Sequence, residues 1–137
     1  MRSEEWPSIL LNAIHAAENQ KFKWGRNDCF IFCGEVARQM TGRDLFANYD
    51  FRGKYKTPKG ALKLMRKYGF YDLKHIWDSF AQSIPVQYAG RGDIVMIDVD
   101  QLIPATGLVV DSRAAFLTKK GFTYHPLTIA HSARRIE

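Results

Sequence analysis

The first 80 or so residues place apolar side chains at the three- and four-residue spacing of amphipathic helices. Ser3 and Thr57 are predicted N-caps, and each is followed by a proline suited to the first turn, Pro7 and Pro58. Gly69 is a predicted stop for the helix that begins after Thr57. The spacing therefore predicts four helices, which cover about residues 4–19, 28–41, 58–68 and 73–80.

The second predicted helix is the best specified of the four. Asn27 or Asp28 can accept hydrogen bonds from its first-turn N–H groups, and Gly42 suits the position that ends it. Its apolar residues form one continuous face without a gap, and they are Cys29, Phe32, Cys33, Val36, Ala37 and Met40. One side of this helix is therefore expected to lie in the core, and Cys29 begins that side.

After Gly92 the pattern changes to short runs rich in valine, isoleucine and aromatic residues, separated by turn residues. The predicted strands cover residues 94–99, 106–110, 114–118 and 122–127. Helices first and strands second indicate an α+β fold, with N-terminal helices packed on a small antiparallel sheet. With 137 residues, 46% of them hydrophobic, the chain suits one domain over 1–137, helical over about 1–82 and strand-rich over about 92–137.

The formal charge of +6 comes from one segment, residues 51–71, which holds seven basic residues and no acidic one. Removing those seven from the 20 basic residues leaves 13 against 14 acidic ones. The third helix places four of them on the face opposite its apolar residues, and they are Lys59, Lys63, Arg66 and Lys67. Such a face can bind nucleic acid, an acidic protein or an anionic cell-wall polymer. An ordinary solvated helix surface explains the same pattern, and the segment contains no known nucleic-acid reading motif.

Cys29 is the residue most suited to chemistry. In the first turn of a helix, the dipole and the free N–H groups favour a thiolate, which is the nucleophilic form of cysteine. The neighbouring Asp28 acts in the opposite direction. Cys33 is expected to be a buried thiol, because two cysteines four apart on one helix suit neither a disulfide nor a zinc site. Histidines, cysteines and acids do not cluster at ligand spacing, so no metal or cofactor is expected.

The segment Phe22–Phe32, with Asp28-Cys29 opening a helix, resembles the nucleophile segment of NlpC-type (papain-like) cysteine peptidases. Arg91–Val95 and Thr106–Val110 are similar to the first and second core strands of that family. Further short motifs follow in an order that resembles a branch of phage and prophage proteins encoded with tail components, over residues 6–137: Trp24-Gly25, Met40-Thr41-Gly42, Tyr55, Gly60-Ala61, Ala114-Ala115-Phe116 and Gly121. The resemblance implies a papain-like NlpC-type fold with Cys29 as candidate nucleophile.

The chain departs from the active families at one position. In them a histidine begins the second core strand and acts as general base, whereas the aligned residue here is Ala105. Among the four histidines, His15 is expected to be solvated, and His75 and His131 lie outside any motif. His125 lies in a predicted strand just before Pro126, which makes it the least implausible substitute base. A structural role is the more common one for such a strand histidine.

Three functions are consistent with these features. The first is a phage- or prophage-associated accessory in tail assembly or at the tail tip, with weak or absent hydrolase activity. The second is an active peptidase or amidase that cleaves peptidoglycan stem peptides. The third is a basic module that binds nucleic acid or an acidic partner. The N-terminus lacks a secretory signal and no apolar run suits a membrane span, so we expect a bacterial cytoplasmic protein, or one carried in a phage particle, without a membrane partner.

Overall fold

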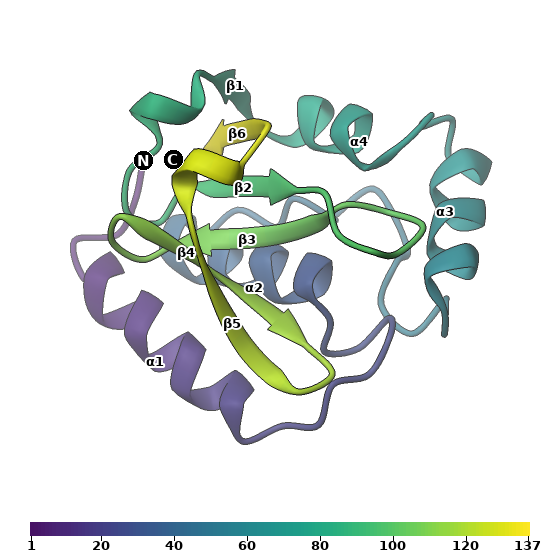
Figure 1. Ribbon diagram of the computed structural model, residues 1–137, viewed down its shortest axis with the longest axis horizontal. Helices are drawn as coiled ribbons and strands as arrows, with labels where there is room; N and C mark the ends of the chain where they lie inside the picture. Colours follow the sequence, from purple (N-terminus) through teal and green to yellow (C-terminus); the bar gives the residue numbers. More distant parts are fainter.

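The computed structural model describes residues 1–137 and contains four α-helices and one six-stranded sheet, whose arrangement can be followed in Figure 1. The elements follow the chain as α1 (Trp6–Glu18), α2 (Cys29–Thr41), α3 (Pro58–Lys67), α4 (Leu73–Phe80), β1 (Gln82–Ile84), η1 (Val86–Tyr88), β2 (Ile94–Ile97), β3 (Ala105–Val109), β4 (Arg113–Thr118), β5 (Gly121–Pro126), η2 (Leu127–Ile129) and β6 (Ser132–Arg135). The predicted α+β class, with N-terminal helices packed on an antiparallel sheet, is confirmed. No helix combines the length and the apolar character needed to cross a membrane.

The sheet has the strand order β1-β6-β2-β3-β4-β5, and every neighbouring pair is antiparallel. Strands β2 to β5 lie side by side in sequence order and correspond to the four predicted strands. The chain then returns so that β6 pairs with β2 on one side and with β1 on the other. Sequence analysis missed β1 and β6, because each has at most four residues and gains its partner from a distant part of the chain.

Three of the four helices begin and end close to the predicted residues. The Asp28 side chain caps α2, Gly42 ends it with φ 76°, and the Thr57 side chain caps α3. The predicted Ser3 cap of α1 is wrong, because the helix starts at Trp6 and its N-cap is Glu5, without a side-chain cap. Ser3 instead lies in a preceding turn, where its N–H donates to the Met40 carbonyl at the end of α2, at 2.7 Å.

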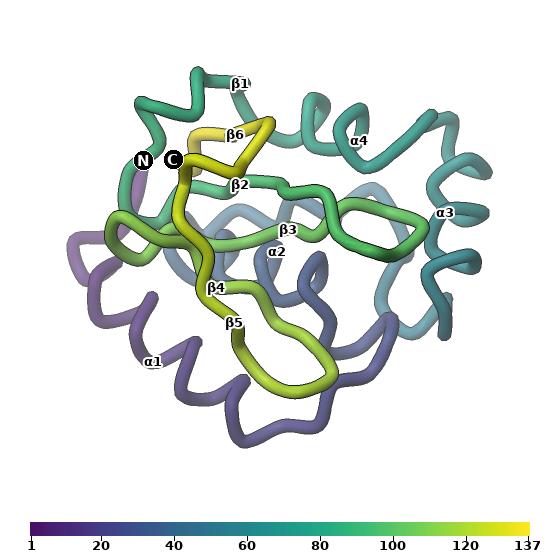
Figure 2. The backbone as a smooth tube through the Cα atoms, in the orientation of Figure 1, coloured from purple at the N-terminus to yellow at the C-terminus, as the bar shows by residue number.

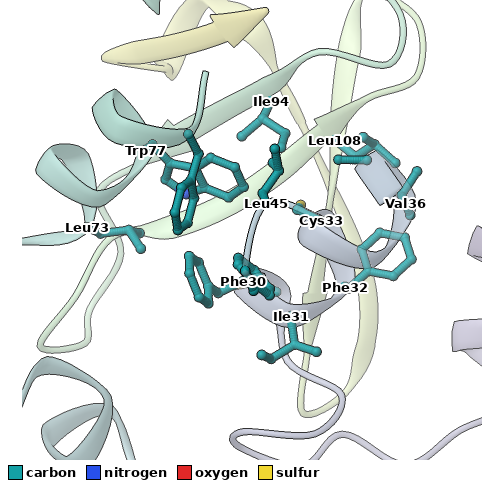
Figure 3. Packing of buried hydrophobic residues seen from close by; sticks show 14 of the residues in the cluster. Phe30, Ile31, Phe32, Cys33, Val36, Leu45, Leu73, Trp77, Ile94 and Leu108 are labelled. Carbon is teal, nitrogen blue, oxygen red and sulfur yellow. The ribbon is translucent and has the colours of Figure 1, made fainter. Parts of the chain in front are cut away.

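Helix α2 lies behind the middle of the sheet and forms the centre of the main core (Figure 1). That core has 29 buried residues from the helices and from one face of the sheet, and Figure 3 shows Cys33 and Phe30 of α2 among Trp77, Ile94 and Leu108. A smaller cluster of seven buried residues, Ala105 among them, occupies the other face of the sheet. Val86 of η1 and Leu127 of η2 pack against this second cluster.

The two chain ends meet beside β2, as the tube in Figure 2 shows. Asp93, which is buried, accepts hydrogen bonds from the Arg2 guanidinium at 2.9 Å and from the Ile136 N–H at 3.0 Å. Gly92 before it has φ 90°, a conformation that favours glycine. The Arg91-Gly92-Asp93 motif therefore joins the N- and C-terminal segments to the start of β2.

Arg134 of β6 is fully buried and connects the sheet to α4. Its guanidinium donates to Ser132 Oγ at 2.7 Å, to the Ala133 carbonyl at 2.8 Å and to Asp78 Oδ1 of α4 at 2.5 Å. A buried guanidinium needs such partners, because desolvation of an unpaired charge is costly. The contact fixes β6 against the helical layer.

Candidate active site

The start of α2 is held by one carboxylate. Asp28 Oδ1 accepts the Ile31 N–H at 2.8 Å, while Oδ2 accepts the Gly25 N–H at 2.8 Å and the Tyr55 hydroxyl at 2.6 Å. Gly25 has φ 81°, and a Cβ there would lie 2.3 Å from the Tyr55 carbonyl oxygen, so a side chain does not fit. The segment from Trp24 to Cys29 thus builds a tight turn that makes Cys29 the first residue of α2.

Cys29 is buried, with 6% of its surface exposed. Burial raises the pKa of its thiol to about 12, and the nearby Asp28 carboxylate adds to the rise. Hydrogen bonds from the backbone of Thr106 and Phe30 lower the pKa, but by less. A thiol with a pKa raised in this way is protonated at neutral pH.

The position of Cys29 at a helix start favours a thiolate, whereas its burial favours the neutral thiol. Desolvation disfavours the charged form, and here it outweighs the first-turn N–H groups. Cys33, one turn further on, has no exposed surface, as predicted for a buried thiol. Burial also raises the pKa of Cys33 well above its ordinary value.

A groove of about 430 Å³ lies over Cys29. Its lining comes from the loop before α2, the start of α3, the β2–β3 connection and the β4–β5 hairpin. Cys29, Ala105 and His125 all line this groove. The structure thus brings the candidate nucleophile, the residue at the expected base position and the candidate substitute base to one surface hollow.

Ala105 is the first residue of β3 and is buried. The backbone of the next residue, Thr106, lies near enough to Cys29 to lower the pKa of its thiol, so the beginning of β3 is close to the start of α2. Ala105, the residue at the expected base position, thus lines the same groove as Cys29, and its side chain packs in the cluster on the other face of the sheet.

His125 lines the same groove on β5, where it pairs with Ala114 of β4, which in turn pairs with Val109 of β3. The register thus separates His125 from Ala105 by two strands, about 10 Å, and by four residues along the strand, about 13 Å. Its ring packs edge-on against Phe116, with centroids 5.5 Å apart, and no hydrogen bond joins it to Cys29.

The other three histidines have local partners elsewhere on the molecule. His15 is exposed on α1, 3.6 Å from Glu18, and His131 lies 3.2 Å from Asp98. His75 Nδ1 accepts the Tyr71 N–H at the start of α4. Histidine, cysteine, aspartate and glutamate side chains also form no group of three or more that could hold a metal ion.

The four basic residues predicted to share a face of α3, Lys59, Lys63, Arg66 and Lys67, are all exposed. None of them forms an ion pair within the chain. Their helix lies at the periphery of the molecule, at the right edge of Figure 1, with Ala61 and Met65 facing the core. Their role as an anion-binding face stays a prediction.

Sequence reasoning assigned no role to two features of the site. Tyr55 contacts Asp28 from 27 positions away, and no local pattern signals such a bond. Lys119 and Lys120, at the turn between β4 and β5, lie on the groove rim. Their position follows only from the folding of the hairpin across the sheet.

The chain belongs to the family described as "Domain of unknown function (DUF6950)", whose model matches residues 1–136. No curated protein matches it significantly. Among solved structures it is similar to the one described as "Crystal structure of NlpC/p60 domain of peptidoglycan hydrolase SagA", with a TM-score of 0.54 and 16% sequence identity. The match covers 94% of this chain and 97% of the other. At this identity the likeness shows the fold, which is the NlpC-type papain-like fold that the motifs predicted.

Proposed function

We propose that this domain is an NlpC-like scaffold with little or no hydrolase activity, which serves as an accessory in the assembly or at the tip of a phage or prophage tail. The observation that carries the first part is that Ala105, which has no proton acceptor, stands at the expected base position and lines the groove over Cys29. A cysteine hydrolase needs a base that removes the thiol proton and then returns it to the leaving amine.

Two further features support weak activity. The raised pKa of Cys29 leaves almost no thiolate at neutral pH, and burial limits access of a scissile carbonyl to the sulfur. Loss of a catalytic partner in a nucleophile–base pair costs roughly 10⁴- to 10⁶-fold in rate. A domain that lacks the base and also keeps its thiol protonated is better suited to binding than to turnover.

The association with phage tails rests on the order of short motifs along residues 6–137. A location in the bacterial cytoplasm or in the assembled particle is part of this proposal. The test is to purify tails from an induced prophage and to probe them for the tagged chain, with the gene deleted in parallel. Loss of tails or of infectivity on deletion supports the role, whereas normal, infective particles without the chain contradict it.

Hydrolase activity is tested with purified peptidoglycan and with a synthetic stem peptide. We expect no release of products above that of the Cys29→Ala variant, which removes the sulfur and serves as the matched control. The Ala105→His variant supplies an imidazole at the base position and tests whether the remaining site supports turnover. Release of products by the unchanged protein, abolished in Cys29→Ala, would overturn the proposal.

An active peptidase or amidase acting on stem peptides is the second candidate. It is favoured by the location of His125 in the lining of the same groove as Cys29. In that case His125→Ala would abolish the activity as completely as Cys29→Ala. If both variants keep the rate of the unchanged protein, neither residue is catalytic.

A basic binding module is the third candidate. It is favoured by the exposed and unpaired side chains on α3, Lys59, Lys63, Arg66 and Lys67. Binding of an anionic polymer by this face would weaken steeply with salt. A Lys63→Glu, Lys67→Glu double variant should then lose the binding, and unchanged binding would exclude this face.

A further inference from the structure

The groove over Cys29 has a small and apolar floor. Ile97, Ala105 and Phe116 form it on the sheet side, and Cys29 closes it at the start of α2. Because Ala105 has only a methyl group, an occupant can approach the sheet more closely than a larger side chain would allow. The volume of about 430 Å³ lies in the range of ligand pockets.

Aromatic side chains form one wall of the groove. Phe22 and Trp24 pack edge to face with centroids 5.1 Å apart, and both are partly exposed. Pro58, the first residue of α3, extends this lining. Rigid rings of this kind bury apolar side chains of a bound chain at low entropic cost.

The rim of the groove is positively charged. Lys119 and Lys120 line it from the β4–β5 turn. Both are exposed, and neither forms an ion pair within the chain. Asp100 is the one acidic residue in the lining.

We infer that this groove binds an extended acidic segment of a partner protein, with apolar side chains against the floor and carboxylates at the lysine rim. The inference rests on the proposed function, in which the groove serves for docking. Charge complementarity selects an acidic partner over a neutral or basic one. A nucleic acid fits the groove less well, because the floor is apolar and suits side chains such as valine.

The test measures binding by fluorescence anisotropy with a labelled peptide that alternates glutamate and valine. A peptide with glutamine in place of glutamate is the charge control, and a single-stranded oligonucleotide is the alternative ligand. The Lys119→Glu, Lys120→Glu double variant changes the rim. The Lys63→Glu, Lys67→Glu double variant makes the same charge change on α3, away from the groove lining.

We expect the acidic peptide to bind the unchanged protein and the rim variant to bind it at least about tenfold more weakly. The α3 variant should differ by less than about threefold. Bound peptide should also slow alkylation of Cys29 at pH 10, which reports occupancy of the groove itself. Equal losses in the two variants, equal binding of the glutamine peptide, or an oligonucleotide that binds at the rim instead would each overturn the inference.

The outcome separates this inference from the proposed function. Cleavage of the bound acidic peptide in a manner that depends on Cys29 would leave the groove assignment intact and refute the lack of activity. Absence of both binding and cleavage would refute the groove assignment and leave the lack of activity standing.

Discussion

Replacement of Asp28 by alanine tests how the site is held together. The Asp28 carboxylate caps α2 through the Ile31 N–H and also accepts bonds from the Gly25 N–H and the Tyr55 hydroxyl. Loss of the cap costs about 1 kcal/mol. Each of the other two buried donors, left without an acceptor, adds about 1–3 kcal/mol. We therefore expect Asp28→Ala to lower the free energy of unfolding by about 3–7 kcal/mol.

A double-mutant cycle with Tyr55→Phe isolates one of these bonds. Tyr55→Phe alone should cost about 1.5–3 kcal/mol, since it removes a hydrogen bond to a charged acceptor. Because the double variant no longer contains the orphaned hydroxyl, its loss should fall short of the sum by about 1–3 kcal/mol. Urea unfolding followed by circular dichroism gives the four values. Thr57→Ala, an exposed cap that accepts one N–H, is the control and should cost about 1 kcal/mol. Losses that add within about 0.5 kcal/mol would show that Asp28 and Tyr55 are not coupled.

Three further predictions concern the core around the site. The pKa of Cys29 is about 12 in the folded protein and near the ordinary value of 9.0 in the unfolded chain. Between pH 9 and pH 12 the folded state therefore binds more protons, so the free energy of unfolding falls by up to about 1.4 kcal/mol per pH unit as the pH rises. Cys29→Ser should flatten the pH dependence of urea unfolding by that amount, and an unchanged slope would contradict the assignment. Asp78→Ala leaves the buried Arg134 guanidinium without its carboxylate partner. Because Asp78 is half exposed, we expect the free energy of unfolding in urea to fall by only about 2 kcal/mol. An unchanged free energy of unfolding would show that Arg134 does not need this partner. Gly107→Ala would bring a Cβ to 2.4 Å from the Phe116 ring and should cost about 1–3 kcal/mol, with a lowered Tm as the readout and an unchanged Tm as the contrary result.

The local order of residues is sufficient to predict most of the helical layer and the central strands. Asp28 and Gly42 bound α2 because capping depends on groups a few positions away. The start of α1 was mispredicted for a different reason. Ser3 is held by the Met40 carbonyl, which belongs to the far end of another helix. A contact of that kind leaves no mark in the spacing of neighbouring residues.

The sequence by itself determined the α+β class, the placement of Cys29 at a helix start and the alanine at position 105. Only the tertiary structure decided the ionisation of Cys29, because desolvation depends on what packs over the sulfur from other parts of the chain. It also decided the pairing of β1 with β6 and the bond from Tyr55 to Asp28, which join residues far apart in sequence. Local sequence patterns determine helix periodicity and capping, whereas burial and long-range contacts arise only when the whole chain has folded.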